Sequence, residues 1–369
     1  MIIGYEAKRI YHNRSGLGNY GRNLVRSLNQ YYPQIELRLY NPWQGSVSFK
    51  PGGNVLERLP TPKSKLYAQM WRRSLVCKQA KKEGVQLFHG LSAELPQGLS
   101  KQGIKSIVTV HDLIFLRFPN LYKRIDRKIY ERKVRKACTN ADLVVAISDQ
   151  TRDDIIQFLG ISPLKIKVIG QGCAPEFWED HRPSARTYLE EQKLPKKYAL
   201  FVGTLEERKN PILAAQACLA ENIPLLLVGK PKKYWTDFYQ ALSPKERELI
   251  YPLSGLSQKE LAGLYQLAQV FIYPSNFEGF GIPLVEAMAS KTALISSKNS
   301  ALKEVAGPGS ILLKENSLPE LKEALKVFWS DENFRAQAIL KNSNFVQQFQ
   351  DQVIAEQWFQ TYSDLLGHG

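Results

Sequence analysis

The chain has few cysteines and no long hydrophobic run. Its four cysteines, Cys77, Cys138, Cys173 and Cys218, are scattered over 369 residues and lack the spacing of a metal site. We therefore expect buried free thiols in a reducing compartment. No stretch of 18 apolar residues occurs, which argues against a transmembrane helix, and the N-terminus lacks the layout of a signal peptide. The sequence predicts a cytoplasmic protein.

Paired acidic ligands for a divalent cation are also missing. No Asp-x-Asp triplet occurs, and the five histidines and four cysteines show no ligand spacing. We therefore expect neither a metal nor a resident cofactor. The sequence also lacks a convincing pair of acid and base carboxylates for hydrolysis.

Positive charge is confined to one half of the chain. The net charge is +15, yet residues 1–172 carry 29 Lys/Arg against 12 Asp/Glu, a net of +17, whereas residues 173–369 carry 21 against 23. Such asymmetry implies an anionic partner for the first half. Membrane surface, diphosphate-linked acceptor and nucleic acid all fit this requirement.

Two stretches, 63–82 and 122–136, combine basic and apolar residues, and the second holds eight basic residues in fifteen. Basic amphipathic helices bind anionic membranes peripherally. In the first stretch we expect Leu66, Met70 and Leu75 on one face, with Tyr67 and Trp71 at the interface. Helices packed on a core, with solvated basic backs, explain both stretches equally well.

Short apolar runs alternate with helical patterns along the chain. Predicted strands are residues 2–5, 36–40, 86–89, 106–110, 143–146, 167–169, 198–203, 224–228, 250–253, 270–273 and 293–296. Predicted helices are residues 17–31, 64–83, 122–138, 149–159, 209–220, 257–267, 283–290, 317–328 and 344–366. Two consecutive βα series predict two doubly wound α/β domains. The expected organisation is 1–172, a linker over 173–195, a second domain over 196–345 and a C-terminal helix over 346–369.

The most informative segment is 275–289, Ser-Asn-Phe-Glu-Gly-Phe-Gly-Ile-Pro-Leu-Val-Glu-Ala-Met-Ala. It follows a predicted buried strand, and Pro283 suits the first turn of a helix. Gly279 and Gly281 allow close backbone approach just before the helix N-terminus. Free N–H groups and the helix dipole favour a phosphate there.

Two glutamates flank this phosphate site. Glu278 lies in the loop and Glu286 one turn into the helix, so both can accept hydrogen bonds from vicinal hydroxyls. A phosphate site between two hydroxyl acceptors fits a nucleotide-sugar. The plain alternative is a strand–turn–helix unit with Glu286 on the surface.

Taken whole, the segment closely resembles the donor-site signature of the retaining family-4 glycosyltransferases. That signature has two glutamates separated by seven residues, with Gly-Phe-Gly directly after the first, and the match includes the preceding Tyr-Pro-Ser. The resemblance covers nearly the whole chain and is strongest over 106–150 and 198–307. It implies the GT-B fold: two Rossmann-like domains facing across a cleft, with the C-terminal helix crossing back onto the first.

The resemblance also implies further donor-binding residues in the second half. Within the signature we expect Phe280 and Ile282 to contact the donor beside Gly279, Gly281 and Glu286. After the first strand of the second domain, Arg208 and Lys209 are expected to neutralise the donor diphosphate. Many family members have Arg directly after the glycine where this chain has Thr204, a weaker candidate. Leu256 belongs to a loop expected to hold the nucleotide base.

In the first half, the resemblance points to the loops after two strands. Gly16 and Gly18 match the family's glycine-rich loop, where the backbone reaches the donor or acceptor. His111 and Asp112 match a functional His-Asp pair. We assign His111, with Glu278, to the reacting centre or a sugar hydroxyl, and Asp112 to orienting it or to the acceptor.

The sequence therefore predicts a metal-independent retaining glycosyltransferase. The segment 89–96 and the surroundings of His111 look similar to bacterial mannosyltransferase-like members, which favours GDP-mannose as donor, followed by a UDP-sugar. We expect a glycan or lipid-linked acceptor and no nucleic-acid partner. Two alternatives remain: a nucleotide-sugar epimerase on the same scaffold, with only His111 and Asp112 as acid and base, and a basic nucleic-acid-binding protein without any recognised reader module.

Overall fold

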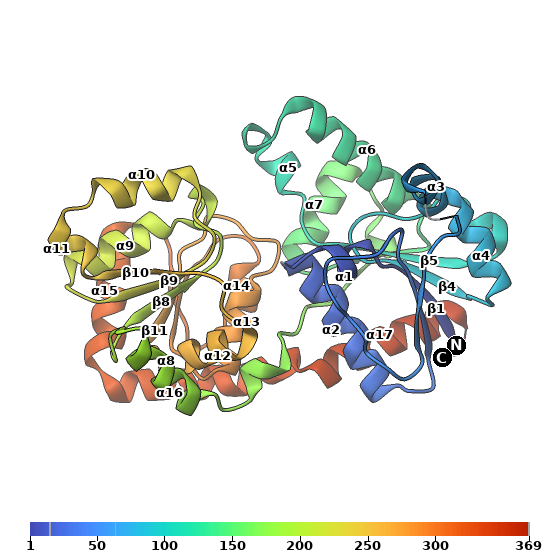
Figure 1. Ribbon diagram of the computed structural model, residues 1–369. Coiled ribbons are helices and arrows are strands. Elements are labelled where there is room, and N and C mark those ends of the chain that lie inside the picture. Colours follow the sequence, from blue (N-terminus) through green and yellow to red (C-terminus); the bar gives the residue numbers. More distant parts are fainter. Residues whose placement is uncertain (15, 63, 368–369) are drawn as a thin grey trace. The chain divides into compact units, whose positions relative to one another are not determined.

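The computed structural model describes residues 1–14, 16–62 and 64–367, which form two compact units (Figure 1). Unit 1 contains Met1–Gly172 and the C-terminal segment from Gln350, and unit 2 contains Cys173–Phe349. Each unit is built on one parallel sheet.

Unit 1 has a seven-stranded sheet in the order β3-β2-β1-β4-β5-β6-β7. Its strands are β1 (Ile2–Glu6), β2 (Glu36–Tyr40), β3 (Val55–Arg58), β4 (Leu87–Gly90), β5 (Lys105–Val110), β6 (Leu143–Ala146) and β7 (Ile166–Val168). Its helices are α1 (Lys8–His12), α2 (Gly16–Tyr31), α3 (Lys65–Met70), the π-helix η1 (Trp71–Leu75), α4 (Val76–Lys82), η2 (Ser100–Gln102), α5 (Ile114–Arg117), η3 (Pro119–Leu121), α6 (Arg124–Asn140), α7 (Asp149–Leu159), η4 (Pro163–Lys165) and α17 (Asp351–Leu366).

Successive side chains of a strand point to opposite faces of the sheet, so the apolar core of unit 1 lies on both faces. Leu87 and Ile107 pack on one face with α1, α2 and α17. Phe88 and Val108 point to the other face, where α4 and α6 lie. Since side chains of a strand alternate in direction, a parallel sheet covered on both faces needs apolar residues at successive positions.

The C-terminal helix α17 belongs to unit 1, where it packs beside α2 (Figure 1). Trp358 and Tyr362 on this helix are fully buried in the core of that unit. The Tyr362 hydroxyl bonds to His89 Nδ1 at 2.8 Å and to the Tyr5 hydroxyl at 3.0 Å. Helix α17 therefore completes the first core although it is last in sequence.

Unit 2 has a six-stranded sheet in the order β10-β9-β8-β11-β12-β13. Its strands are β8 (Ala199–Val202), β9 (Leu225–Val228), β10 (Ile250–Leu253), β11 (Val270–Tyr273), β12 (Leu294–Ser297) and β13 (Ile311–Leu313). Its helices are η5 (Pro175–Trp178), α8 (Arg182–Glu191), η6 (Glu207–Lys209), α9 (Pro211–Ala220), α10 (Lys233–Ala241), α11 (Pro244–Arg247), α12 (Gln258–Leu267), α13 (Ile282–Ala289), α14 (Leu302–Val305), α15 (Leu318–Ser330), α16 (Glu332–Phe345) and η7 (Val346–Phe349).

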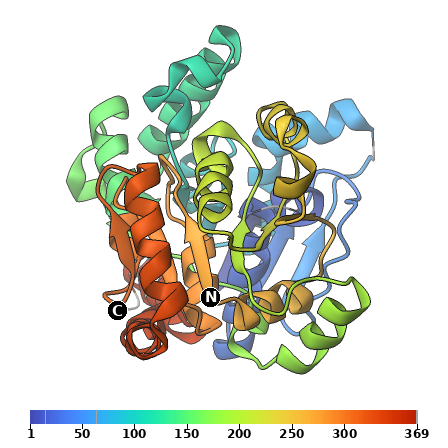
Figure 2. The same cartoon turned by 90° about the vertical axis from the view of Figure 1, so that its left-hand side faces the viewer.

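The helices of unit 2 cover both faces of its sheet (Figure 2). Helices α9, α10 and α15 pack on one face through a shared apolar cluster, while α8, α12 and α13 form a second group. The four strands β8, β9, β11 and β12 are buried along their whole length. The prediction of two doubly wound parallel-sheet domains, with the C-terminal helix on the first, is confirmed.

Several local expectations need correction. Residues 173–195, expected as a linker, lie in unit 2, because η5 and α8 pack on α12. The second unit extends to Phe349, so the last segment of unit 1 begins at Gln350 rather than at 346. The expected helix 64–83 is interrupted by the π-helix η1, and Trp71, expected at a membrane interface, is only 3% exposed.

Candidate active site

The site in unit 2 is built around the turn from β11 into α13. Gly281 precedes the helix with φ 110°, and a Cβ there would lie 2.6 Å from Leu302 Cδ2, so only glycine fits. Pro283 occupies the first turn, and no side chain of the described residues caps this end. Pro283 has no N–H, and the Leu284 N–H donates to the Gly281 carbonyl oxygen at 2.9 Å. Of the first three residues of α13, only Ile282 therefore has an N–H that the described contacts leave to an anion.

Glu278, three residues before that glycine, is the centre of a buried charge cluster. Its Oε1 accepts hydrogen bonds from Lys209 Nζ at 2.8 Å, from the Tyr273 hydroxyl at 2.8 Å and from Ser275 Oγ at 3.0 Å. Arg208 Nη1 lies 2.9 Å from the same oxygen. The structure thus brings together three of the predicted site residues, the adjacent Arg208 and Lys209 and, 69 residues after Lys209, Glu278.

The electrostatics of this cluster keep Glu278 ionised. Burial alone would raise the pKa of its carboxyl group, but Lys209 and Arg208 overcome that effect and lower the pKa to about 2. All four contacts reach Oε1. Among the described residues, Oε2 is therefore the oxygen left to accept a hydrogen bond from a ligand hydroxyl.

The two cations are held by the loop after β8. Arg208 Nη2 donates to Glu206 Oε1 at 2.8 Å, and its Nη1 also bonds to the carbonyl oxygen of Phe277. The Asn276 N–H donates to the Arg208 carbonyl at 2.8 Å, which ties this loop to the 275–278 loop. Thr204 lies in the same loop, partly exposed, and no described contact joins it to Glu278.

Glu286 has a different environment on the second turn of α13. Burial raises the pKa of its carboxyl group to about 7, although the Tyr265 hydroxyl, 3.1 Å from Oε2, and the charge of Lys209 both act in the opposite direction. Part of the Glu286 side chain remains accessible. This group therefore changes charge near neutral pH, while Glu278 does not.

The other signature residues lie on the turn into α13 and at the start of that helix. Phe280 is 6% exposed and packs edge-on against Phe349 with ring centroids 5.8 Å apart, so its side chain belongs to the core. Gly279 lies on the turn between Glu278 and Phe280. Ile282 is the first residue of α13 and is partly exposed. Leu256, in the loop from β10 to α12, is half-buried.

In unit 1, His111 follows β5 and is held on both ring nitrogens. Its Nε2 donates to the Leu91 carbonyl at 2.8 Å, so Nδ1 accepts from Gln171 Nε2, at 3.1 Å. Tyr20 packs edge-on against the imidazole at 4.7 Å. Burial lowers the pKa of His111 to about 4, so the ring is neutral. A ligand hydroxyl would have to displace Gln171 to reach this ring.

The remaining predicted residues of unit 1 have local roles. Asp112 Oδ1 accepts from the Ile114 N–H at 3.1 Å at the start of α5. The two glycines lie in the first turn of α2 instead of a free loop: a Cβ on Gly18 would lie 1.8 Å from the Asn13 carbonyl oxygen, whereas Gly16 has open space around it. Ser15, between Arg14 and Gly16, lies outside the described residues.

Four polar residues of the site in unit 2 were not predicted as site residues. Tyr273 and Ser275 both bind Glu278, Ser300 Oγ accepts from the Glu278 N–H at 2.8 Å, and Tyr265 binds Glu286. The Tyr-Pro-Ser string before the signature was the only available signal, and it covers the first two. Among residues 1–14, 16–62 and 64–367, no group of three His, Cys, Asp or Glu side chains is placed to hold a metal ion, and no helix is long and apolar enough to cross a membrane.

Two family models match consecutive parts of this sequence. The family described as "Glycosyltransferase Family 4" matches residues 14–177, and "Glycosyl transferases group 1" matches residues 188–344. Both models describe glycosyltransferases, and together they cover most of the chain. The chain is accordingly a glycosyltransferase with the GT-B fold, as the sequence predicted.

Individual relatives agree with this assignment. The glycosyltransferase is 24% identical to O-antigen chain mannosyltransferase B of Escherichia coli, over 95% of this chain and 96% of that protein. It is 49% identical to the MMP alpha-(1->4)-mannosyltransferase of Mycolicibacterium hassiacum, over 52% of this chain but only 42% of that protein. The solved structure of sucrose-phosphate synthase from Thermosynechococcus elongatus superposes with a TM-score of 0.80 at 18% identity, covering all of both chains, which establishes the fold alone.

Proposed function

We propose that this glycosyltransferase transfers a sugar, with retention and without a metal, from a nucleotide-sugar to a glycan or lipid-linked glycan in bacterial surface polysaccharide assembly. GDP-mannose is the preferred donor and a UDP-sugar the next. The names of the mannosyltransferase relatives support the sugar. One observation carries the proposal: Arg208, Lys209 and Glu278 meet directly before the N-terminus of α13, which no side chain of the described residues caps.

This arrangement separates the two parts of a nucleotide-sugar. The Ile282 N–H at the start of α13 and the cations of Arg208 and Lys209 would stabilise the donor diphosphate as it gains charge on leaving. The described residues account for two of the three N–H donors of Lys209, at Tyr273 and Glu278, so one remains for a phosphate oxygen. Glu278 Oε2 and Glu286 would accept hydrogen bonds from sugar hydroxyls.

The reaction then needs no nucleophile from the enzyme. The bond between sugar C1 and the phosphate oxygen breaks, and the acceptor oxygen forms its bond to C1 on the same face. The acceptor hydroxyl passes its proton to the departing phosphate. His111 and Asp112 in unit 1 are proposed to bind a sugar hydroxyl or orient the acceptor, with Gln171 yielding its place on His111.

A membrane surface is the second proposed partner. Apolar side chains are exposed on two basic helices: Leu66 is 72% and Met70 51% exposed on α3, and Ile125 is 74% and Ile129 47% exposed on α6. Each basic residue near an anionic bilayer contributes about 1 kcal/mol, within a Debye length of about 8 Å. Co-sedimentation with anionic vesicles at low salt, lost at high salt, is expected, and no binding to them at low salt would exclude this partner.

Thermal-shift measurements with GDP-, UDP- and ADP-sugars test the proposed donor. A ligand at about a hundred times its Kd stabilises the protein by roughly 2.7 kcal/mol. We expect the largest shift with GDP-mannose. A shift with RNA but with no nucleotide-sugar would favour the nucleic-acid-binding alternative, and epimerisation of a bound donor without transfer would favour the epimerase.

A further inference from the structure

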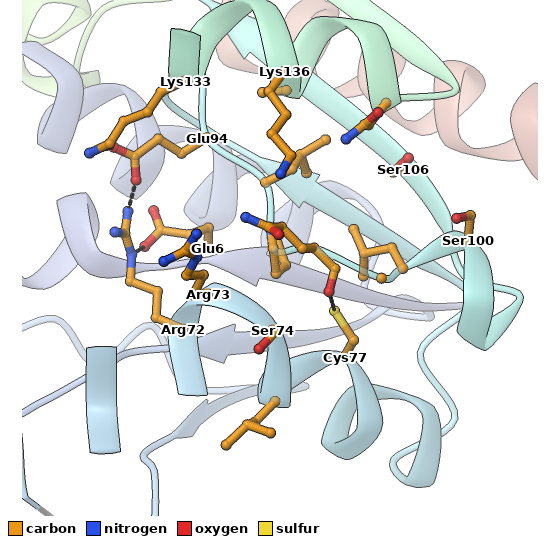
Figure 3. Close-up of a pocket in the computed structure, with 18 of the residues that line it drawn as sticks. Glu6, Arg72, Arg73, Ser74, Cys77, Glu94, Ser100, Ser106, Lys133 and Lys136 are labelled. Carbon is orange, nitrogen blue, oxygen red and sulfur yellow. Dashed lines mark hydrogen bonds and ion pairs between the residues drawn. The ribbon is translucent and has the colours of Figure 1, made fainter. Parts of the chain in front are cut away.

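A large groove lies within unit 1 on the sheet face that carries α4 and α6. Two separate apolar clusters cover this face, one under α4 around Phe88 and one under α6 around Val108. Between them is an open groove of about 1190 Å³ (Figure 3). This volume is above the roughly 300–1,000 Å³ of ordinary small-molecule sites.

The lining of the groove is both apolar and cationic. Leu75, Leu95, Leu99 and Ile129 supply apolar surface along it. Eight Lys or Arg residues line it against two acidic ones. In Figure 3, Lys133 and Lys136 extend from α6 towards Arg72 and Arg73 of η1. The groove therefore favours an anion that also carries an apolar part.

Both acidic lining residues are already used by one arginine. Arg72 Nε lies 2.6 Å from Glu6 Oε1, and Arg72 also pairs with Glu94. Lys133 Nζ lies 4.0 Å from Glu94, at the limit of an ion pair. Arg73 and Lys136 have no acidic partner among the described residues, so the groove retains an excess of positive charge that an anionic ligand would neutralise.

The two adjacent arginines of the π-helix η1 have different environments. Trp71 begins it, is buried, and donates from Nε1 to Gln79 Oε1 at 2.9 Å. Arg72 is held by the two acids, whereas Arg73 is exposed on the groove, and its carbonyl accepts from the N–H of Gln97, another lining residue, at 2.7 Å. Because π-helical turns are rare and frequent at functional sites, this turn is a second sign of a binding site.

We propose that the groove binds an amphiphile through its phosphate or diphosphate group, with Arg73, Lys133 and Lys136 as the main cations and the apolar part along Leu95, Leu99 and Ile129. The identification of this amphiphile as the acceptor rests on the proposed function. Binding of the amphiphile to the groove does not rest on the proposed function, because every lining residue belongs to unit 1.

Calorimetric titration of the full chain tests the ligand class with three probes. These are decyl diphosphate below its micelle concentration, inorganic pyrophosphate, and decyl maltoside as an uncharged amphiphile. We expect decyl diphosphate to bind at least about tenfold more tightly than pyrophosphate, since apolar burial adds to charge, and decyl maltoside not to saturate. If pyrophosphate bound as tightly as decyl diphosphate, or if decyl maltoside bound saturably, the proposal that the ligand is an amphiphilic phosphate would be wrong.

Variants locate the site. Arg73→Gln/Lys133→Gln/Lys136→Gln changes three exposed side chains and should weaken decyl diphosphate binding at least about tenfold. The control Lys245→Gln/Lys291→Gln/Lys341→Gln removes the same charge from exposed positions of unit 2 and should bind as the wild type does. Equal weakening in both variants would show a non-specific charge effect and overturn the site.

A donor titration separates this inference from the proposed function. The groove variant should bind GDP-mannose as the wild type does. If the wild type binds no nucleotide-sugar but decyl diphosphate binding depends on the groove, the donor proposal fails and the groove stands. If donor binding is normal and the groove variant retains decyl diphosphate affinity, the groove inference fails alone.

Discussion

Replacing Lys209 by Met tests the charge cluster at Glu278 while preserving side-chain length. The side chains of Lys209 and Glu278 are only 14% and 11% exposed, so water screens their interaction weakly. Loss of a hydrogen bond to a charged group costs about 1.5–3 kcal/mol. We expect this range for Lys209→Met. A wholly unpaired buried charge would cost about 3–5 kcal/mol, but Arg208 remains 2.9 Å from Glu278 Oε1.

The assay is a double-mutant cycle with Glu278→Gln, measured by urea unfolding and by hydrogen exchange of the peptides covering 270–290. The control is Lys245→Met, an exposed lysine of the same unit. We expect the effects of Lys209→Met and Glu278→Gln to be non-additive by about 1.5 kcal/mol or more. Simple additivity would refute the assigned interaction.

The pH dependence of the stability difference between the wild type and Lys209→Met provides a second test of this interaction. Because the folded-state pKa of Glu278 is lowered from 4.5 to about 2, its contribution to stability is full above 4.5 and is lost as the pH falls towards 2. The wild type and Lys209→Met should therefore differ most at neutral pH and converge in acid. A difference that is unchanged at low pH would contradict this account.

Three further predictions concern other groups. Burial raises the pKa of Glu286 to about 7, so its carboxylate forms as the pH rises through that value. Donor affinity, measured by calorimetry from pH 5.5 to 8.5, should therefore increase with pH and have its midpoint near pH 7. The Glu286→Gln variant should show no such midpoint. Gly281→Ala forces a non-glycine residue to φ 110° against Leu302 and should cost about 1–3 kcal/mol in thermal unfolding, whereas Gly16→Ala, with open space around it, should be nearly neutral. Tyr362→Phe leaves His89 Nδ1 unsatisfied in the core and should cost about 1–3 kcal/mol, seen as faster hydrogen exchange in β4; unchanged exchange there would contradict the role of α17.

Much of the architecture was predictable because buried parallel strands are nearly continuous apolar runs. The strands 250–253 and 270–273 have the predicted bounds. The edge strand β3 was missed because only its ends are half-buried and Leu56 and Glu57 are exposed, so it lacks the apolar run. The strand β13, at the edge of the sheet of unit 2, was also missed, because it is only three residues long.

The site was predictable where chemistry and spacing coincide and less so where tertiary contacts decide. Glu278, Arg208 and Lys209 were each predicted as site residues, and they meet because their loops follow neighbouring parallel strands, β11 and β8; the ion pairs between them were not predicted. The bonds of His111 to Leu91 and Gln171 come from residues distant in sequence and left no local pattern. The π-helix likewise has no signature that separates it from an α-helix in the sequence.

Hydrogen exchange with and without GDP-mannose, in EDTA, tests the central claim most directly. If unit 2 holds the donor without a metal, peptides covering 203–210 and 275–289 should gain protection, because Lys209, Glu278 and the Ile282 N–H would contact it. UDP-glucose in the same buffer shows whether the protection depends on the base and sugar. No protection of either segment, or protection that requires added magnesium, would contradict the account.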